Sequence, residues 1–298
     1  VEHPMLDVRF WKNPRFSAAS AAITITFLAM FGSIFLLTQY LQFVLGYSPL
    51  STGVRLLTFA VPMMVVSPLS PKVVERIGTK YTVALGLLCV AVGLVTLGGV
   101  SQTTPFLDIG WRMALAATGM ALTMSPATES IMGSLPLARA GVGSAVNDTT
   151  RQVGGAVGVA VIGSVFSSIY GSKVVAALQG HHIPSDLVAN AKQQLGYAIE
   201  AAGRLPASAA HTFVVLAKSS FMDGFHAGLY VGAAVTVIGV VTTLVFLPSR
   251  ARAEDVERQD AEFAERPDAA AVAVPAGTPA PAAVDGNGAP HPAPAPVK

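Results

Sequence analysis

Long runs without a charged side chain constrain this sequence more than any other feature. The first run covers residues 16–54 and the second covers residues 81–107, and neither contains Asp, Glu, Lys or Arg. A helix needs about 20 apolar residues to cross the hydrocarbon core of a bilayer. Helices suit that environment because their backbone hydrogen bonds are made within the segment itself. Only 12% of the residues are charged, against roughly a quarter in soluble domains. We therefore predict an all-α integral membrane protein.

The apolar runs divide into six predicted transmembrane helices. They lie at about residues 17–41, 50–71, 81–100, 110–135, 141–168 and 226–247. Residues 1–16 are predicted to be a cytoplasmic lead-in, and residues 17–249 are predicted to form one six-helix unit. The charged and then Pro/Ala-rich residues 250–298 are predicted to be a disordered cytoplasmic tail.

Two connections carry further predictions. Residues 72–80 are expected to form a short charged loop, and Pro62 and Pro68 are expected to kink the helix before it. A long polar segment at about 171–223 is predicted to be an outer loop. Within it, apolar residues after Ser185 recur at helical spacing. They indicate either an amphipathic helix lying on the membrane face or a loop packed on itself.

Lys and Arg are concentrated in alternate connections, which sets the orientation because such residues favour the cytoplasmic side. They occur in the lead-in, in residues 72–80, after the fourth span and at the start of the tail, whereas the short connections near Gly46 and Gln102 hold none. The sequence therefore predicts a multi-pass protein of the plasma or inner cell membrane with both termini in the cytoplasm.

The six spans differ in polarity. The first, second, fourth and fifth contain amide or charged side chains, whereas the third and sixth have no ionisable residue in their cores. Polar groups inside a bilayer must face protein or water. The four polar spans are therefore expected to line a polar cavity, and the two others to face lipid. The same order occurs twice, which predicts a three-plus-three internal repeat.

Glu129 is the first candidate for binding a proton or a cationic substrate. It is predicted to lie about five turns into the fourth span, where insertion scales assign an ionised side chain roughly 2.5–3.5 kcal/mol. The alternative is a structural carboxylate near the inner interface. The other proton or substrate candidates are polar residues of the cavity-lining spans: Gln39, Tyr40, Gln42 and Arg112.

The fifth span begins with a polar turn and continues as a helix of small residues. Asn147, Asp148 and Arg151 share its first turns, because residues three and four apart lie on one helix face. Arg151 is a gating candidate that would bridge to an acidic group on another helix, and the alternative is an anchor to lipid head groups. Gly154 with Gly158, and Ala156 with Ala160, form small-residue stripes that permit close helix packing.

Several function classes are not supported by the sequence. The single cysteine, Cys89, excludes an intrachain disulfide and a thiolate zinc cluster. No glycine loop of the Walker type is present, and no convergent catalytic set suggests an enzyme. The net charge of +2 gives no indication of nucleic acid as a partner. We expect no cofactor and no metal.

Three stretches resemble the C-terminal half of a major facilitator superfamily transporter, and more narrowly the fourteen-span drug:proton antiporters of the QacA/EmrB type. They are QYLQFVLGYSPLSTGVRLL from Gln39, PKVVERIGTK from Pro71 and SPATESIMGSLPLARAGVGSAVNDTTRQVGGAVGVAVIGSV from Ser125. The second is similar to the superfamily's cytoplasmic signature, Gly-x-x-x-Asp-Arg-x-Gly-Arg-Arg. The residues that match it in kind are Glu75, Arg76, Gly78 and Lys80, while Pro71 and Thr79 depart from it.

The resemblance covers about residues 1–250 and implies one half of a proton-coupled multidrug efflux antiporter, a function linked to antibiotic resistance. It implies an amphiphilic or cationic small-molecule substrate, the proton gradient as energy source, and an N-terminal half that is missing here. It also assigns a gating role to the signature residues. The alternatives are a metabolite transporter of the same fold and a non-transporting membrane scaffold surrounded by lipid.

Overall fold

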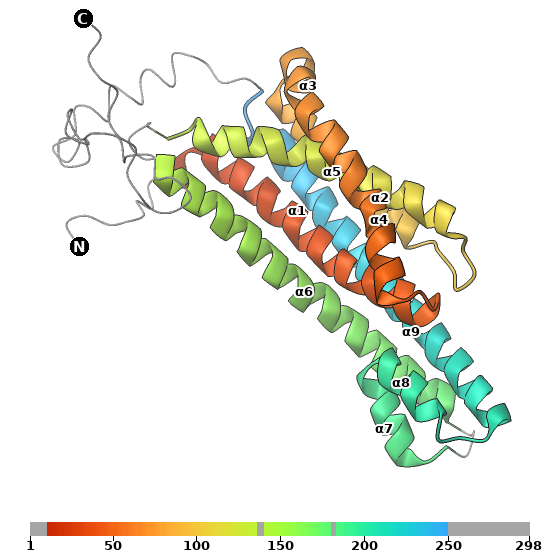
Figure 1. The fold of residues 1–298 in the computed structure, drawn as a ribbon. Coiled ribbons are helices and arrows are strands. Elements are labelled where there is room, and N and C mark those ends of the chain that lie inside the picture. Colours follow the sequence, from red (N-terminus) through yellow and green to blue (C-terminus); the bar gives the residue numbers. More distant parts are fainter. Residues whose placement is uncertain (1–10, 136–139, 180–182, 250–298) are drawn as a thin grey trace, which may run out of the picture.

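The computed structural model describes residues 11–135, 140–179 and 183–249, and within these ranges all regular structure is helical (Figure 1). The predicted tail and most of the predicted lead-in lie outside the described residues. In chain order the elements are α1 (Pro14–Gln39), η2 (Tyr40–Val44), α2 (Pro49–Val66), η3 (Ser67–Leu69), α3 (Ser70–Ile77), α4 (Thr79–Leu97), α5 (Phe106–Met132), α6 (Ala140–Leu178), α7 (Ser185–Gln193), α8 (Leu195–Ala202) and α9 (Ala207–Phe246).

Local sequence signals fix the starts of the first two long helices. Asn13 precedes α1, and its side chain accepts a hydrogen bond from the backbone N–H of Arg15 at 3.0 Å. Ser48 does the same for α2, where it accepts from the N–H of Ser51 at 3.2 Å. Each cap is followed directly by proline, which lacks the N–H that a helix start leaves unbonded. The turn between the two helices contains Gly46 at φ +74°.

Five of the described helical segments are long and apolar enough to cross a membrane: Pro14–Val44, Pro49–Ile77, Thr79–Leu97, Ala140–Leu178 and Ala207–Phe246. The 27-residue α5 is long enough, but it carries Asp108, Arg112 and Glu129. A sixth span therefore stays a prediction. α6 and α9 have 39 and 40 residues, which at 1.5 Å per residue corresponds to about 60 Å. This is about twice the hydrocarbon thickness of a bilayer.

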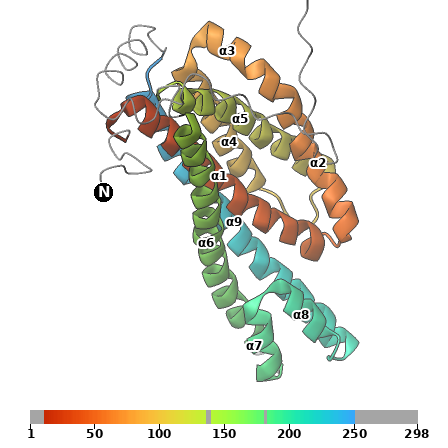
Figure 2. The same cartoon turned by 60° about the vertical axis from the view of Figure 1, so that its left-hand side comes forward.

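Most of the helix contacts follow the pattern that a three-plus-three repeat predicts, although the extensive packing of α6 against α9 has no comparable counterpart between α2 and α4 among the described residues. α1 packs against α6 and α9, and α5 packs correspondingly against α2 and α4. Exchanging α1, α2 and α4 with α5, α6 and α9 converts the first set of contacts into the second. The contacts of α4 with α9 and of α1 with α5 are unchanged by the exchange. Figures 1 and 2 show α2 and α3 at one side of the bundle and α6 at another.

The second span differs from its prediction. Residues 72–77, predicted as part of a loop, belong to α3, which follows α2 through the 3₁₀ turn η3. Pro62 lies inside α2 without ending it, whereas Pro68 lies in η3. Little of this span is covered by the rest of the chain: 6% of its most apolar stretch is buried, against 56% for α1.

The predicted outer loop is largely helical. α6 continues ten residues beyond Ser168, and α9 begins at Ala207 instead of near His226. Between them, α7 and α8 pack on α6 and α9, respectively, so we call α7 and α8 the cap (Figure 1). The apolar residues predicted to lie on the membrane face are buried by protein instead, and Leu187, Ala191, Leu195 and Ala198 form part of the main core.

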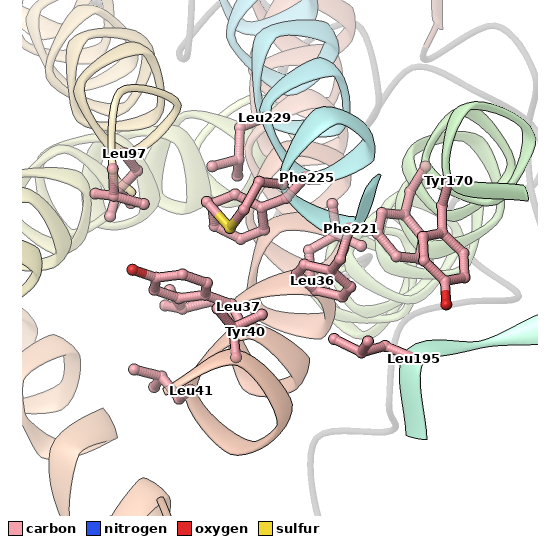
Figure 3. Close-up of a cluster of buried hydrophobic side chains, with 14 of the residues drawn as sticks. Leu36, Leu37, Tyr40, Leu41, Leu97, Tyr170, Leu195, Phe221, Phe225 and Leu229 are labelled. Carbon is pink, nitrogen blue, oxygen red and sulfur yellow. The ribbon is translucent and has the colours of Figure 1, made fainter. Parts of the chain in front are cut away.

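A ladder of aromatic rings explains why α6 and α9 continue together beyond the bundle. Tyr40 stacks on Phe225 with ring centroids 4.9 Å apart, and Phe225 stacks on Phe221 at 6.0 Å. Phe221 then contacts Phe166 edge-on at 4.9 Å, and Phe166 stacks on Tyr170 at 5.6 Å. The Tyr170 hydroxyl donates to the carbonyl of Ala191 in α7 at 2.8 Å. The ladder therefore connects η2, which continues α1, to the cap through α9 and α6, and Figure 3 shows Tyr40, Phe225, Phe221 and Tyr170 of this ladder.

Candidate functional site

The turn between α3 and α4 carries the gating residues that the signature suggested. Glu75 and Arg76 are exposed, Lys80 is half-buried, and Gly78 is buried at φ +85° and ψ 159°. Directly after Gly78, the N–H of Thr79 donates to the carbonyl of Ser249 at 3.0 Å. A Cβ on Gly78 would lie 2.6 Å from the same carbonyl oxygen. This turn, which we call the Gly78 turn, therefore holds the end of α9 by backbone contact.

Arg151 bridges to α5 through a hydroxyl group and not through an acid. Its Nη2 donates to Thr128 Oγ1 at 3.2 Å, and the Thr128 hydroxyl donates to Asn147 Oδ1 at 3.4 Å. The guanidinium carbon lies 5.8 Å from the centre of the Phe27 ring, and Nε is buried without a hydrogen-bond partner. Asp148 is exposed, and neither it nor Glu75 pairs with Arg151 within the described residues.

Glu129 is not buried, contrary to the sequence-based expectation. It lies within one turn of the end of α5 at Met132, and its side chain is exposed. The fourth helix starts at Phe106, earlier than predicted, but the end of the helix determines where Glu129 lies. It follows Thr128 directly, so the exposed carboxylate and the Arg151–Thr128 hydrogen bond occupy the same turn of α5.

The glycines of α6 lie where this helix meets α1. A Cβ on Gly154 would lie 2.5 Å from the carbonyl oxygen of Thr24, and one on Gly158 would clash with the backbone of Leu28. Larger residues at these positions would force the two helices apart. Ala156 and Ala160, the second predicted stripe, are exposed and face away from this contact.

Three side chains hold the end of α4 and the connection after it at the end of the bundle nearer the cap. Tyr40 Oη donates to the carbonyl of Ser101 at 2.6 Å, His226 Nε2 to that of Val100 at 2.8 Å, and Tyr230 Oη to that of Gly98 at 3.0 Å. Lys218 Nζ similarly donates to the carbonyl of Val44 at 2.9 Å, at the end of η2. Tyr40 is fully buried, so it is a structural residue and not the predicted substrate contact.

The cavity between the helices is apolar, whereas the sequence predicted a polar one. It has a volume of about 110 Å³ and is lined from α1, α2, α4, α5 and α9. The lining includes Met30, Phe59, Met113 and Leu229, and its one hydroxyl group, on Ser33, donates to the carbonyl of Ala29. The third and sixth spans thus contribute to the cavity, in contrast to the prediction that they only face lipid.

The remaining predicted residues lie near this cavity or at its level. Gln39 and Gln42 are half-buried at the junction of α1 and η2, and the structure gives neither a hydrogen bond. Arg112 lies in the second turn of α5, next to the cavity residue Met113. Among the described residues, no group of three or more His, Cys, Asp and Glu side chains is arranged to hold a metal ion.

Sequence reasoning missed the residues whose roles depend on distant partners. Thr128, Ser249, His226 and Tyr230 make their contacts with residues that are far away in the sequence, with separations such as 126 and 132 residues for the last two. A polar side chain in an otherwise apolar span is a signal for such a contact. It identifies the side chain but not its partner.

Comparisons with known proteins agree with this architecture. Residues 3–159, which are over half of the chain, match the family described as the Major Facilitator Superfamily. A bacterial homologue of the human lysosomal transporter Spinster, solved in an inward-facing, unoccupied conformation, superposes with a TM-score of 0.55 at 16% identity. The match covers 83% of this chain and 52% of that one, and at this identity it shows the fold alone.

Curated relatives give a similar picture. The chain is 34% identical to multidrug resistance protein Stp of Mycobacterium tuberculosis over 56% of this chain and 31% of Stp. It is 29% identical to multidrug efflux pump LfrA of Mycolicibacterium smegmatis, over 80% of this chain and 47% of LfrA. It is 27% identical to the tetracenomycin C resistance and export protein of Streptomyces glaucescens, over 87% of this chain and 48% of that protein.

This chain therefore spans about a third to a half of the length of these relatives. The family match confirms the predicted superfamily, and the structural match agrees with the predicted all-α fold. The chain belongs to the Major Facilitator Superfamily.

Proposed function

We propose that this chain forms one half of a proton-coupled exporter of amphiphilic small molecules in the cell membrane. The observation that carries the proposal is its similarity to about half the length of proteins named for multidrug efflux and drug export. The proton gradient would supply the energy, with no organic cofactor. In the orientation predicted from the distribution of Lys and Arg, the Gly78 turn and both ends of the six-helix unit would lie in the cytoplasm, and the cap would lie outside.

The exposed faces of two helices support a second half. α2 exposes Val54, Leu57, Val61 and Val65, and α6 exposes Val153, Val157 and Val161. In α6 these residues recur every fourth position and form a single stripe. The glycines on the adjacent face of α6 are already used against α1. An N-terminal half of the same transporter would cover both apolar faces, with membrane lipid around the remaining surface.

We propose that the gate lies at the cytoplasmic end, where Arg151 reaches across to α5. Its hydrogen bond to Thr128 joins two helices that otherwise pack mainly on other partners. Glu129 is exposed beside this bond, on the side where protonation from water is possible. Protonation of Glu129 would remove a negative charge next to Arg151 and shift the balance between open and closed arrangements. Glu75, Arg76 and Lys80 would add charge pairs at the same end.

The test is transport of cationic and neutral dyes by the full-length protein in inside-out vesicles, with and without a pH gradient. Glu129→Gln should reduce gradient-driven dye movement, and Glu200→Gln, which removes an exposed carboxylate from the cap, should not. Dye movement that is independent of the gradient would refute proton coupling. Transport of no dye, with movement of a polar metabolite instead, would refute the drug-efflux assignment while preserving the fold.

A further inference from the structure

Two arginines lie on facing helices at the cap-side end of the bundle. Arg55 is in the second turn of α2 and Arg112 is in the second turn of α5, and both helices start at this end. The two helices approach closely between them, since a Cβ on Gly110 would lie 3.3 Å from Thr58 Cγ2. Neither arginine forms an ion pair within the described residues.

Among the residues that the structure describes, none forms a hydrogen bond with the Arg112 side chain, although a suitable acid is close in sequence. Its Nε and Nη1 atoms are buried and have no hydrogen-bond partner. Its guanidinium carbon lies 5.3 Å from the centre of the neighbouring Trp111 ring. Asp108 is four residues before it, which is the spacing that favours a helix ion pair. Asp108 is nevertheless exposed and unpaired with Arg112. Three of the five guanidinium donors, those on Nε and Nη1, are thus turned away from water and from the nearby acid, and acceptors from outside this chain would satisfy them.

Arg55 is held in place on the opposite helix. Its guanidinium carbon lies 3.7 Å from the centre of the Tyr47 ring and 5.1 Å from that of Phe106. One nitrogen donates to the carbonyl of Ser51 at 3.2 Å and to the hydroxyl of the same residue. Its Nε is also buried without a partner. The aromatic and hydroxyl contacts keep a second positive charge on the helix that faces Arg112.

The apolar cavity lies at the same level as these two charges. Leu56 and Met113, the residues that follow Arg55 and Arg112, both line it. Phe59 and Ala116 line it one turn further along the same helices. Its volume of about 110 Å³ approaches that of an apolar cavity that admits benzene. The same two helices therefore place two cationic groups beside an apolar space that extends one turn further from the cap-side end.

We propose that this part of the half binds an anionic amphiphile, with a carboxylate or phosphate on Arg112 and the first part of its hydrocarbon chain in the cavity. Arg pairs with both anions through two parallel hydrogen bonds, which would satisfy its buried nitrogens. Two guanidiniums that form no ion pair within the described residues would repel a cationic head group at the cap-side end of the bundle. The inference rests on the proposed function and deepens it, because it names the charge of a substrate class. A soluble fatty acid and an anionic phospholipid offer the same chemistry.

The experiment compares binding of two probes with chains of equal length, dodecanoate and dodecyltrimethylammonium, to the full-length protein in neutral detergent. No pH gradient is applied, so failure of transport and failure of binding are separate results. We expect tighter binding of dodecanoate. Arg112→Met should weaken dodecanoate binding about tenfold or more, as loss of a charge-assisted hydrogen bond predicts. Arg112→Lys should retain part of it, and Arg204→Gln, which removes an exposed charge from the turn after α8, should have no effect.

A second variant tests the cavity without altering the charge. Leu56→Trp fills the cavity from α2, the least covered helix, and should weaken dodecanoate binding while leaving short-chain butanoate unaffected. Displacement of dodecanoate from the wild type by phosphatidylglycerol, but not by phosphatidylcholine, would identify an anionic phospholipid as an occupant. Displacement by neither lipid would assign the site to soluble amphiphiles. Equal binding of the two probes, or equal effects of Arg112→Met and Arg204→Gln, would refute the proposal.

Discussion

Replacement of Gly78 by alanine should loosen the Gly78 turn from the end of α9. The residue has φ +85° and ψ 159°, a combination that is essentially restricted to glycine and costs about 1–3 kcal/mol for other residues. The added Cβ would lie 2.6 Å from the carbonyl oxygen of Ser249. That oxygen accepts the hydrogen bond from Thr79 at 3.0 Å, which contributes about 1 kcal/mol. The total expected loss in the free energy of unfolding is therefore about 2–4 kcal/mol.

Gly46 supplies a matched control for this substitution. It also has positive φ, at +74°, but a Cβ there would meet nothing within 4 Å. Gly46→Ala should therefore show only the backbone strain, about 1–2 kcal/mol. The difference between the two variants isolates the contact with Ser249.

Two measurements check this prediction. Unfolding in mixed micelles of dodecyl maltoside and dodecyl sulfate gives the free-energy changes of both variants. Hydrogen exchange at the amide of Thr79 should become about tenfold faster or more in Gly78→Ala, because 1.4 kcal/mol corresponds to a factor of ten. Equal losses in the two variants, with unchanged exchange at Thr79, would show that the turn is not held by Ser249.

Three further predictions concern other contacts. Gly158→Leu should separate α6 from α1 and lower the melting temperature strongly, whereas Gly141→Leu, which meets nothing within 4 Å, should not. Thr128→Val and Arg151→Gln should be non-additive in dye efflux, because one hydrogen bond joins them; strict additivity would argue against a shared role. Phe221→Ala should cost about 3–5 kcal/mol and increase hydrogen exchange in the cap, and unchanged exchange there would contradict the role of the aromatic ladder.

The apolar runs predicted the class of fold because membrane solvation leaves few alternatives for a backbone. They did not predict where α6 and α9 end. Their extensions are stabilised by partners such as Phe166 with Phe221 and Tyr170 with Ala191, and no hydropathy window contains such pairs. The apolar pattern after Ser185 is compatible with an amphipathic helix or a loop packed on itself, and the structure has two helices there. A pattern of apolar residues does not distinguish protein from lipid as the buried neighbour.

The candidate site was less predictable, and Tyr40 and Glu129 show why. Both were selected as polar groups within apolar spans. The Tyr40 hydroxyl donates a hydrogen bond to the carbonyl of Ser101, and its ring stacks on Phe225. Both partners are far from Tyr40 in the sequence. Glu129 was placed by counting from an estimated helix start, but its exposure is set by the nearby end of α5. The residue type shows that a side chain is polar, but the role of that side chain depends on which residue it contacts in the fold.

The two ends of this half are stabilised in different ways, and this bears on which end can open. At the cap-side end, Tyr40, His226 and Tyr230 fix three successive parts of the α4 terminus, and the aromatic ladder continues the same packing. At the opposite end, α6 reaches α5 through Arg151 and Thr128. A hydrogen bond between two side chains is exchanged for water more readily than several buried contacts. Within this half, rearrangement should therefore begin between α5 and α6, while the cap and the ladder move as one body.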